Sequence, residues 1–137
     1  MVDVTVNTNV PAAVQEVWET IGKFGALADW HPAISSSETE EGGKKRRLIL
    51  VDGSEIVEEL VEKDDGSRTY TYTMTQPGPL PVQNYKSTIK VEDDGKGNSK
   101  VTWSGHFDPT SDPDEARKAI ENVYQSGLDN LRKMMGG

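Results

Sequence analysis

The residues with the clearest chemical potential are an arginine and a glutamate on two strand-like segments that flank an Asp-Gly turn signal. Arg46 alternates with two leucines, and Glu58 alternates with an isoleucine and a leucine. Side chains two positions apart share a face of a strand, so both charges face inward if these apolar neighbours do. A glutamate buried against apolar walls has a raised pKa and can act as a general acid or base.

The turn between these segments decides where the pair points. A three-residue turn, Asp52-Gly53-Ser54, places Arg46 and Glu58 on one face of the sheet. A two-residue Asp-Gly turn shifts the register and places Arg46 opposite Glu59 instead. A slip of one residue turns every side chain to the other face, so the pair could also face solvent on this glutamate-rich strand.

A second group of residues could line a ligand cavity. His31 follows a short helical segment and could titrate near neutrality at a cavity mouth, although such a residue more often caps a helix end. Aromatic, thioether and hydroxyl side chains on the strand faces predicted to point inward suit a flat, mostly hydrophobic ligand, but could equally fill a core. The candidate ligand-binding residues are Trp30, His31, Tyr70, Tyr72, Met74, Tyr85, Ser87, Trp103, Phe107, Val123 and Gly127.

Other chemistries are disfavoured by what the chain lacks. The chain has no cysteine, which excludes disulfides, thiolate catalysis and sulfur ligands for a metal. Its two histidines are far apart in the sequence and do not form a metal-binding motif. Glycine-rich phosphate loops and the serine-hydrolase and zinc-protease motifs are also absent. We therefore expect neither a metal nor a cofactor.

Charge and hydropathy narrow the partners. A net charge of −8 disfavours nucleic-acid binding, which normally needs a basic face. The chain contains no run of about 18 apolar residues, which a membrane-spanning helix would need. The first residues do not have the pattern of a secretory signal, so we expect a cytoplasmic protein.

The elements that must position these residues follow from the spacing of apolar side chains. Residues 2–7 alternate and predict a strand, whereas residues 14–21 have helical spacing and precede a second short helix. About six strand segments separated by turns follow and predict an antiparallel meander. From Asp112, a plausible N-cap followed by Pro113, helical spacing returns over roughly twenty residues, or ~30 Å. Only this helix is long enough to cover a face of the sheet.

Two glycines lie on the surfaces predicted to meet. Gly127 interrupts the apolar stripe of the long helix, where glycine costs ~1 kcal/mol relative to alanine, and Gly105 interrupts the apolar face of the last strand. Missing side chains on facing surfaces predict a cavity, to which Ala116 adds a third small residue. The alternative is close backbone packing of helix on sheet.

Short motifs spread over nearly the whole chain occur in the order found in one known superfamily. They are Pro11…Val17-Trp18, Phe24-Gly25…Trp30-His31-Pro32-Ala33-Ile34, Gly53…Glu58-Glu59-Leu60, Gly78-Pro79-Leu80-Pro81-Val82…Tyr85, Trp103-Ser104-Gly105…Phe107 and Gly127-Leu128…Leu131. With the element order, they resemble the polyketide cyclase/dehydrase-like (SRPBCC) branch of the START/Bet v 1-like helix-grip superfamily. The resemblance implies an α+β fold over residues 1–137 as one domain: a curved seven-stranded antiparallel sheet wrapped around a long C-terminal helix, with two short helices after the first strand.

The resemblance leaves three functions open, because this superfamily contains lipid carriers, hormone receptors, cyclases and dehydratases. The first is binding of a hydrophobic, aromatic or polyketide-like small molecule between sheet and helix. The second is a cofactor-independent cyclase or dehydratase, since some enzymes of the superfamily use an arginine and a glutamate on these strands, here Arg46 and Glu58, for proton transfer. The third is a co-chaperone-like interaction module, which would need an exposed apolar patch. We expect a monomer or homodimer.

Overall fold

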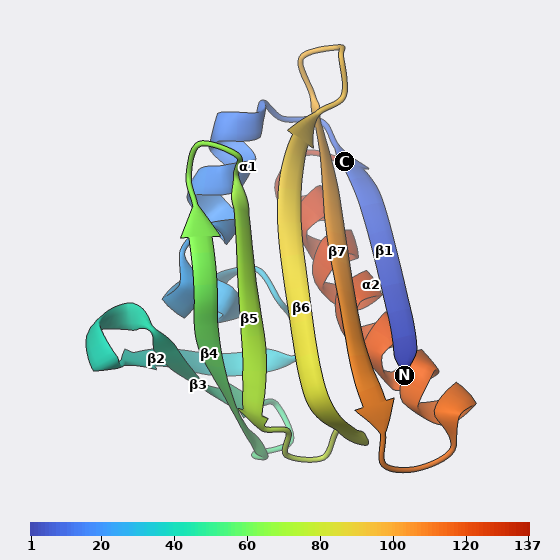
Figure 1. The fold of residues 1–137 in the computed structure, drawn as a ribbon. Coiled ribbons are helices and arrows are strands. Elements are labelled where there is room, and N and C mark those ends of the chain that lie inside the picture. Colours follow the sequence, from blue (N-terminus) through green and yellow to red (C-terminus); the bar gives the residue numbers. More distant parts are fainter.

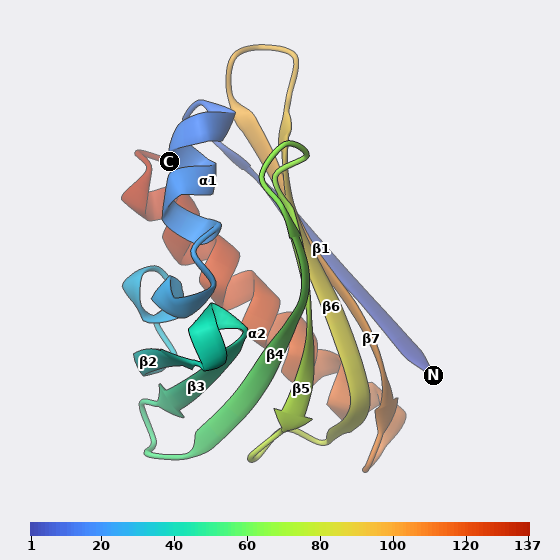
Figure 2. The same cartoon turned by 60° about the vertical axis from the view of Figure 1, so that its left-hand side comes forward.

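The computed structural model describes residues 1–137 as a seven-stranded antiparallel sheet with all helices on one of its faces (Figures 1 and 2). The strands are β1 (Val2–Val10), β2 (Ile34–Glu40), β3 (Lys45–Leu50), β4 (Glu55–Asp64), β5 (Thr69–Gln76), β6 (Val82–Asp93) and β7 (Ser99–Pro109). The α-helices are α1 (Val14–Ile21) and α2 (Pro113–Met134), and two short 3₁₀ turns are η1 (Phe24–Asp29) and η2 (Glu41–Gly43).

The sheet is a meander from β2 to β7 that β1 closes by pairing with β7, in the order β1-β7-β6-β5-β4-β3-β2. Register shifts interrupt the ladders in β2, β4 and β6. Such bulges bend a strand and increase its twist. The sheet accordingly curves around α2, as Figure 2 shows from the side.

Helix α2 has the ends that its sequence predicts. The Asp112 side chain accepts a hydrogen bond from the Glu115 backbone N–H (3.1 Å), and Pro113 occupies the first turn. Arg132 and Lys133 lie in the last turn, where positive charge favours the helix dipole. The buried stripe of the helix packs on the concave face of the sheet and consists of Ala116, Ile120, Tyr124, Gly127, Leu128 and Leu131.

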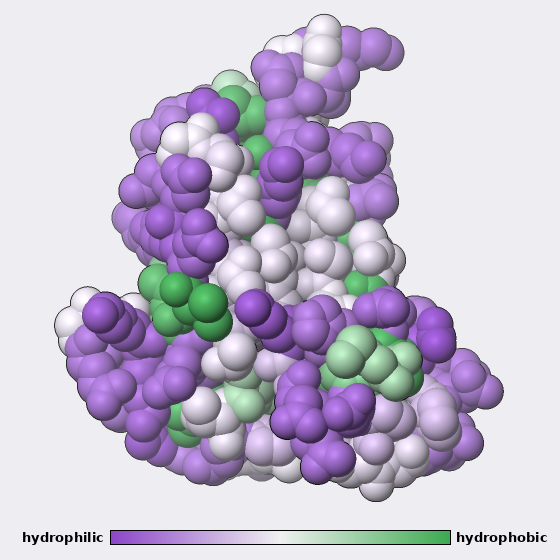
Figure 3. All heavy atoms as spheres, viewed as in Figure 1, coloured by the Kyte–Doolittle hydropathy of each residue, from purple (hydrophilic) through white to green (hydrophobic).

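One continuous core of apolar side chains fills the space between the concave face and the helices. The opposite, convex face is mainly hydrophilic or weakly polar, with small separate hydrophobic areas (Figure 3). The exposed large apolar side chains belong to different elements, with Val51 in the β3–β4 turn, Val61 on β4 and Met134 at the end of α2. None of the helices is long and apolar enough to cross a membrane. The predicted helix-grip fold is confirmed.

Candidate ligand cavity and its buried polar groups

A cavity of about 50 Å³ lies between the concave face of the sheet, η1 and α2. Leu50, Met74, Leu80 and Val123 are only half-buried, so the cavity approaches the surface on their side. Of the 15 residues that line it, 13 are hydrophobic. The lining residues are Leu27, His31, Ala33, Ile34, Leu48, Leu50, Ile56, Glu58, Tyr72, Met74, Leu80, Tyr85, Trp103, Ile120 and Val123.

The β3–β4 hairpin places Arg46 directly opposite Glu58, and both side chains are buried. The Leu50 N–H donates to the Ser54 carbonyl (2.9 Å), which leaves residues 51–53 in the turn, with Gly53 at φ +89°. The turn therefore has three residues, but it begins one residue earlier than the predicted Asp52-Gly53-Ser54. This register turns the pair toward the core, as the three-residue alternative required.

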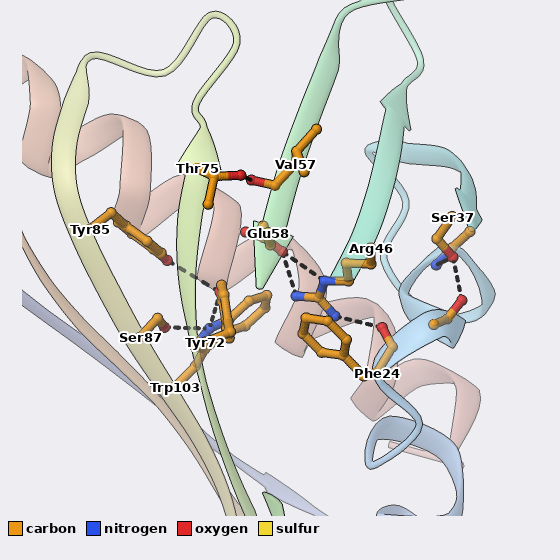
Figure 4. A network of polar contacts seen from close by, with 12 residues as sticks. Phe24, Ser37, Arg46, Val57, Glu58, Tyr72, Thr75, Tyr85, Ser87 and Trp103 are labelled. Atoms are coloured by element: carbon orange, nitrogen blue, oxygen red, sulfur yellow. Dashed lines mark hydrogen bonds and ion pairs between the residues drawn. The ribbon is translucent and has the colours of Figure 1, made fainter. Parts of the chain in front are cut away.

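Arg46 has partners on both sides of its guanidinium (Figure 4). Nε donates to Glu58 Oε1 (2.7 Å), Nη1 donates to the Phe24 carbonyl (2.9 Å), and Nη2 lies 2.6 Å from Oε1 without hydrogen-bonding geometry. The guanidinium also stacks over the Phe24 ring at 4.2 Å and lies 4.9 Å from the Tyr72 ring. Arg46 thus ties η1 to the sheet and fixes one oxygen of Glu58.

The second carboxylate oxygen of Glu58 is left for the cavity. Both contacts of Arg46 with the carboxylate are made to Oε1, and no protein group forms a hydrogen bond with Oε2. Glu58 lines the cavity although its side chain is only 4% exposed. Burial raises the pKa of Glu58, and the attraction of the neighbouring arginine only partly offsets this effect. Arg46 keeps its charge at any ordinary pH.

Beside the cavity, buried hydroxyl groups form a continuous series of hydrogen bonds whose direction is fixed at one end. Ser87 Oγ donates to the Ser104 carbonyl (2.8 Å), so it accepts a bond from the Tyr124 hydroxyl (2.9 Å). Because the Tyr124 proton is used there, the Tyr85 hydroxyl must donate to Tyr124. A backbone carbonyl thereby sets the orientation of each hydroxyl behind it.

The series continues through Tyr72 to Trp103 at the other end. The Tyr85 proton is committed, so the Tyr72 hydroxyl donates to Tyr85 (3.2 Å), and Trp103 Nε1 donates to Tyr72 (3.1 Å) and to Ser87 Oγ (3.0 Å). Burial raises the pKa of each of the three tyrosines, so their hydroxyls stay protonated. We call this series the hydroxyl chain; its members are Tyr72, Tyr85, Tyr124, Ser87 and Trp103.

The space beside Gly105 and Gly127 is occupied by neighbouring side chains and is not empty. A Cβ atom on Gly105 would collide with the Tyr124 hydroxyl, and one on Gly127 would lie 2.6 Å from His31 Cδ2 and 3.1 Å from the Trp103 ring. Neither glycine lines the cavity, nor does Ala116. The prediction that these small residues leave room for the cavity is therefore wrong: neighbouring side chains occupy the space at both glycines.

His31 is held in one neutral tautomer by two backbone groups. Nδ1 accepts from the Ala33 N–H (3.2 Å), so the proton is on Nε2, which donates to the Val123 carbonyl (2.7 Å). Burial lowers the pKa of His31; the bond to Val123 opposes this, and the positive charge of Arg46 adds to it. The ring therefore joins the loop after η1 to the middle of α2.

The structure brings together part of the predicted site. Of the candidate ligand-binding residues, His31, Tyr72, Met74, Tyr85, Trp103 and Val123 line the cavity, whereas Trp30, Tyr70, Ser87, Phe107 and Gly127 do not. In the predicted catalytic pair, Glu58 lines the cavity and Arg46 lies behind it. Tyr70 shows why the two sets differ, because it shares the concave face with Tyr72 but packs against the rings of Trp18 and Phe24.

Sequence reasoning missed one central residue, Tyr124, and most of the aliphatic wall. Tyr124 falls on the apolar stripe of α2, where its spacing predicts burial, and a buried tyrosine needs a partner for its hydroxyl. Ser87, which was predicted to face inward, is one such partner. That combination was the available signal. The aliphatic residues carry no comparable signal, since any core contains them.

Comparisons with known proteins agree with this architecture. The model of the family "Polyketide cyclase / dehydrase and lipid transport" matches residues 1–136. The solved structure of XoxI from Bacillus cereus is 38% identical, with a TM-score of 0.95 over 98% of this chain and 96% of that chain. An uncharacterised protein from Bacillus thuringiensis is 39% identical, with a TM-score of 0.93 over 98% of both chains.

A more distant structure shares the fold alone. The Zhui aromatase/cyclase from Streptomyces sp. R1128 is 19% identical, with a TM-score of 0.77 over 98% of this chain and 93% of that chain. No curated protein sequence matches the chain. Because the family model spans nearly every residue of the sheet and helices described above, the chain belongs to the polyketide cyclase/dehydrase and lipid transport family, the branch that its motifs resemble.

Proposed function

We propose that the protein binds a small, mostly apolar molecule in the cavity between the sheet and α2. The observation that carries this proposal is the composition of the wall, in which 13 of 15 residues are hydrophobic and the other two are His31 and Glu58. A concave apolar site with few polar groups is typical of small-molecule binding sites.

The volume of the cavity favours a compact ligand. A cavity of about 150 Å³ is known to hold benzene, whereas this one measures about 50 Å³. A single ring therefore requires some widening of the wall, and a multi-ring polyketide requires much more. Met74 and Leu80 are half-buried on the open side, and methionine in particular repacks easily. Movement there leaves the buried hydroxyl chain in place.

A titration with a single-ring hydrocarbon tests binding. We expect toluene to shift the indole N–H resonance of Trp103, which lines the cavity, and to raise the unfolding temperature. The variant Val123→Phe fills the half-buried end of the cavity and should abolish both effects. Its matched control is Asn122→Phe on the exposed side of α2, which should bind like the wild type. Equal binding by both variants would place the ligand elsewhere.

A second candidate function, proton transfer, is favoured by the free Oε2 of Glu58 and by the burial that raises the pKa of this carboxyl group. Carboxylates in such surroundings serve as general bases. Glu58 would take a proton from the carbon next to a ligand carbonyl, leaving an enolate. Arg46 would act as a positioning residue that holds Oε1.

Deuterium exchange at the α-carbon of cyclopentanone in D₂O measures this step directly. We expect the wild type to accelerate exchange roughly 100-fold over buffer and Glu58→Gln to lose the acceleration. The exposed neighbour provides the control, since Glu59→Gln should exchange at the wild-type rate. Acceleration that survives in Glu58→Gln would exclude Glu58 as the base.

A further inference from the structure

The polar atoms around the cavity are unequally divided between donors and acceptors. Every N–H or O–H of the lining side chains already has a protein acceptor: the Tyr72 and Tyr85 hydroxyls and Trp103 Nε1 within the hydroxyl chain, and His31 Nε2 at the Val123 carbonyl. The backbone carbonyl at the end of the chain sets these directions, so no hydroxyl can turn its proton toward a ligand without breaking the series.

Among the nitrogen and oxygen atoms of the side chains that line the cavity, the one without a hydrogen-bond partner is an acceptor. Glu58 Oε2 has no hydrogen-bond partner, while Oε1 is held by Arg46. Arg46 does not line the cavity: its Nη1 donates to the Phe24 carbonyl, and its Nη2, which makes no hydrogen bond, lies 2.6 Å from Glu58 Oε1. When Glu58 is ionised, Oε2 faces an apolar space without a donor, which is costly, and a donor supplied by the ligand removes that cost.

Charge balance indicates what kind of donor fits. Arg46 and Glu58 form a neutral pair within a wall that carries no other charge, because His31 is neutral. An ammonium ion entering the cavity would lose its hydration and meet Arg46 as a like charge behind Glu58. An uncharged N–H or O–H loses much less on leaving water.

We infer that the ligand of this cavity is an uncharged, compact apolar molecule that donates one N–H or O–H hydrogen bond to Glu58 Oε2. The inference rests on the proposed binding function and names the class of ligand. A molecule whose only polar atoms are carbonyl oxygens would find no hydrogen-bond donor in the cavity, because the free polar atom there, Glu58 Oε2, is also an acceptor. The cavity should therefore discriminate between molecules of the same size and hydrophobicity by the presence of one proton.

Three five-membered rings of similar size separate these properties. Pyrrole donates an N–H, thiophene has neither a donor nor a strong acceptor, and cyclopentanone only accepts. In titrations followed by NMR at pH 8, we expect pyrrole to bind about tenfold more tightly than thiophene, the ratio typical of a hydrogen bond to a charged group. Cyclopentanone should bind no more tightly than thiophene.

The variant Glu58→Gln should reverse this order. Arg46 can only donate, so it will hold the amide oxygen of glutamine and turn the amide N–H₂ group into the cavity. The variant should then bind cyclopentanone more tightly than pyrrole. Glu59→Gln, on the exposed side of the same strand, should keep the wild-type order. If Glu58→Gln does not fold, the order of the three probes in the wild type still decides the inference.

The possible results separate the inference from the proposed function. If thiophene binds but pyrrole binds no more tightly, the cavity binds ligands and the inference is wrong. If cyclopentanone binds most tightly to the wild type, Glu58 is the donor and the inference is also wrong. If none of the rings binds, the proposed function fails and the inference fails with it. Preference for pyrrole with reversal in Glu58→Gln supports both.

Discussion

Two neighbouring arginines on β3 show how the environment of an ion pair differs between the two faces of the sheet. Arg46 points to the concave face, where its side chain is 0% exposed and paired with Glu58. Arg47 points to the convex face, where its side chain is 35% exposed and contacts Glu40 (3.1 Å) and Glu55. Breaking one partner of a buried pair is costly, whereas exposed pairs contribute little to stability.

The hydroxyl groups repeat this contrast. On the convex face the Thr71 and Thr88 hydroxyls share one hydrogen bond (2.9 Å) near solvent, which can replace either partner. On the concave face the hydroxyl chain satisfies every donor without solvent. Against that background Glu58 Oε2 differs from the other side-chain nitrogen and oxygen atoms that line the cavity, because it alone has no hydrogen-bond partner. The difference between Oε2 and the hydroxyl chain identifies the one lining atom that a ligand could bind without displacing a protein partner.

The largest expected effect comes from removing one partner of the inner pair. Glu58→Leu leaves the permanently charged Arg46 buried without a counter-ion, which should lower the free energy of unfolding by about 3–5 kcal/mol. The matched change on the convex face, Glu55→Leu, removes a partner of Arg47 that solvent can replace, so its effect should be far smaller. Urea unfolding at pH 7 measures both. If the two variants lost similar amounts of unfolding free energy, burial would not make the Arg46–Glu58 pair more important for stability than the exposed pair of Arg47.

A smaller effect is expected at the contact between Gly105 and Tyr124. Gly105→Ala forces the Tyr124 hydroxyl to move and should cost about 1–3 kcal/mol, as overpacking does. In a Tyr124→Phe background the colliding atom is absent, so the same alanine should cost much less. A double-mutant cycle measures this coupling. Additive effects would show that strain at Gly105 has another origin.

Much of the fold could be predicted from the sequence because the strands and α2 differ so clearly in period. The hairpin between β3 and β4 was the exception, because its local residues allowed two turn lengths. In the structure the turn consists of residues 51–53, a register that is visible only in the pairing of the two strands. The register in turn decides the direction of Arg46 and Glu58. Their inward orientation could therefore be stated only as one of two alternatives.

The site was less predictable than the fold, for a physical reason. Alternation tells which face of a strand is inward but not what lies above each position. Tyr70 and Tyr72 are two apart on β5, yet α1 and η1 cover the first while the second reaches the cavity. Likewise, a missing side chain at Gly105 or Gly127 indicates room without indicating what fills it, and here nearby rings and hydroxyls do.

The hydroxyl chain offers a third test of the two faces. Tyr124→Phe leaves the Tyr85 hydroxyl without its acceptor in a place that solvent does not reach, so we expect a loss of about 1–2 kcal/mol in the free energy of unfolding. Thr88→Val removes one hydroxyl from the convex pair, where water can bind Thr71 instead, and should cost less. Denaturant unfolding compares the two. A larger loss in Thr88→Val would contradict the contrast.

The smallest expected effect is on the pH dependence of stability, where the two titratable residues of the cavity oppose each other. The pKa of Glu58 is raised above 4.5, so above that pH the unfolded chain releases a proton that the folded chain still holds, and stability falls as pH rises through the folded-state pKa. The pKa of His31 is lowered below 6.5, so the unfolded chain takes up a proton first, and stability falls as pH falls below that value.

Substituting Glu58 and His31 one at a time separates their opposing contributions to the pH dependence of stability. As pH rises above about 4.5, the stability of the wild type relative to Glu58→Gln should decrease until Glu58 ionises in the folded protein, whereas its stability relative to His31→Gln should increase up to about pH 6.5. The control on the convex face is Glu59→Gln, which removes an exposed carboxylate from the same strand. If the curve for Glu58→Gln ran parallel to the wild type, Glu58 would titrate as an exposed carboxylate does. The cavity would then lack the buried, unpartnered oxygen that distinguishes it from the outer face.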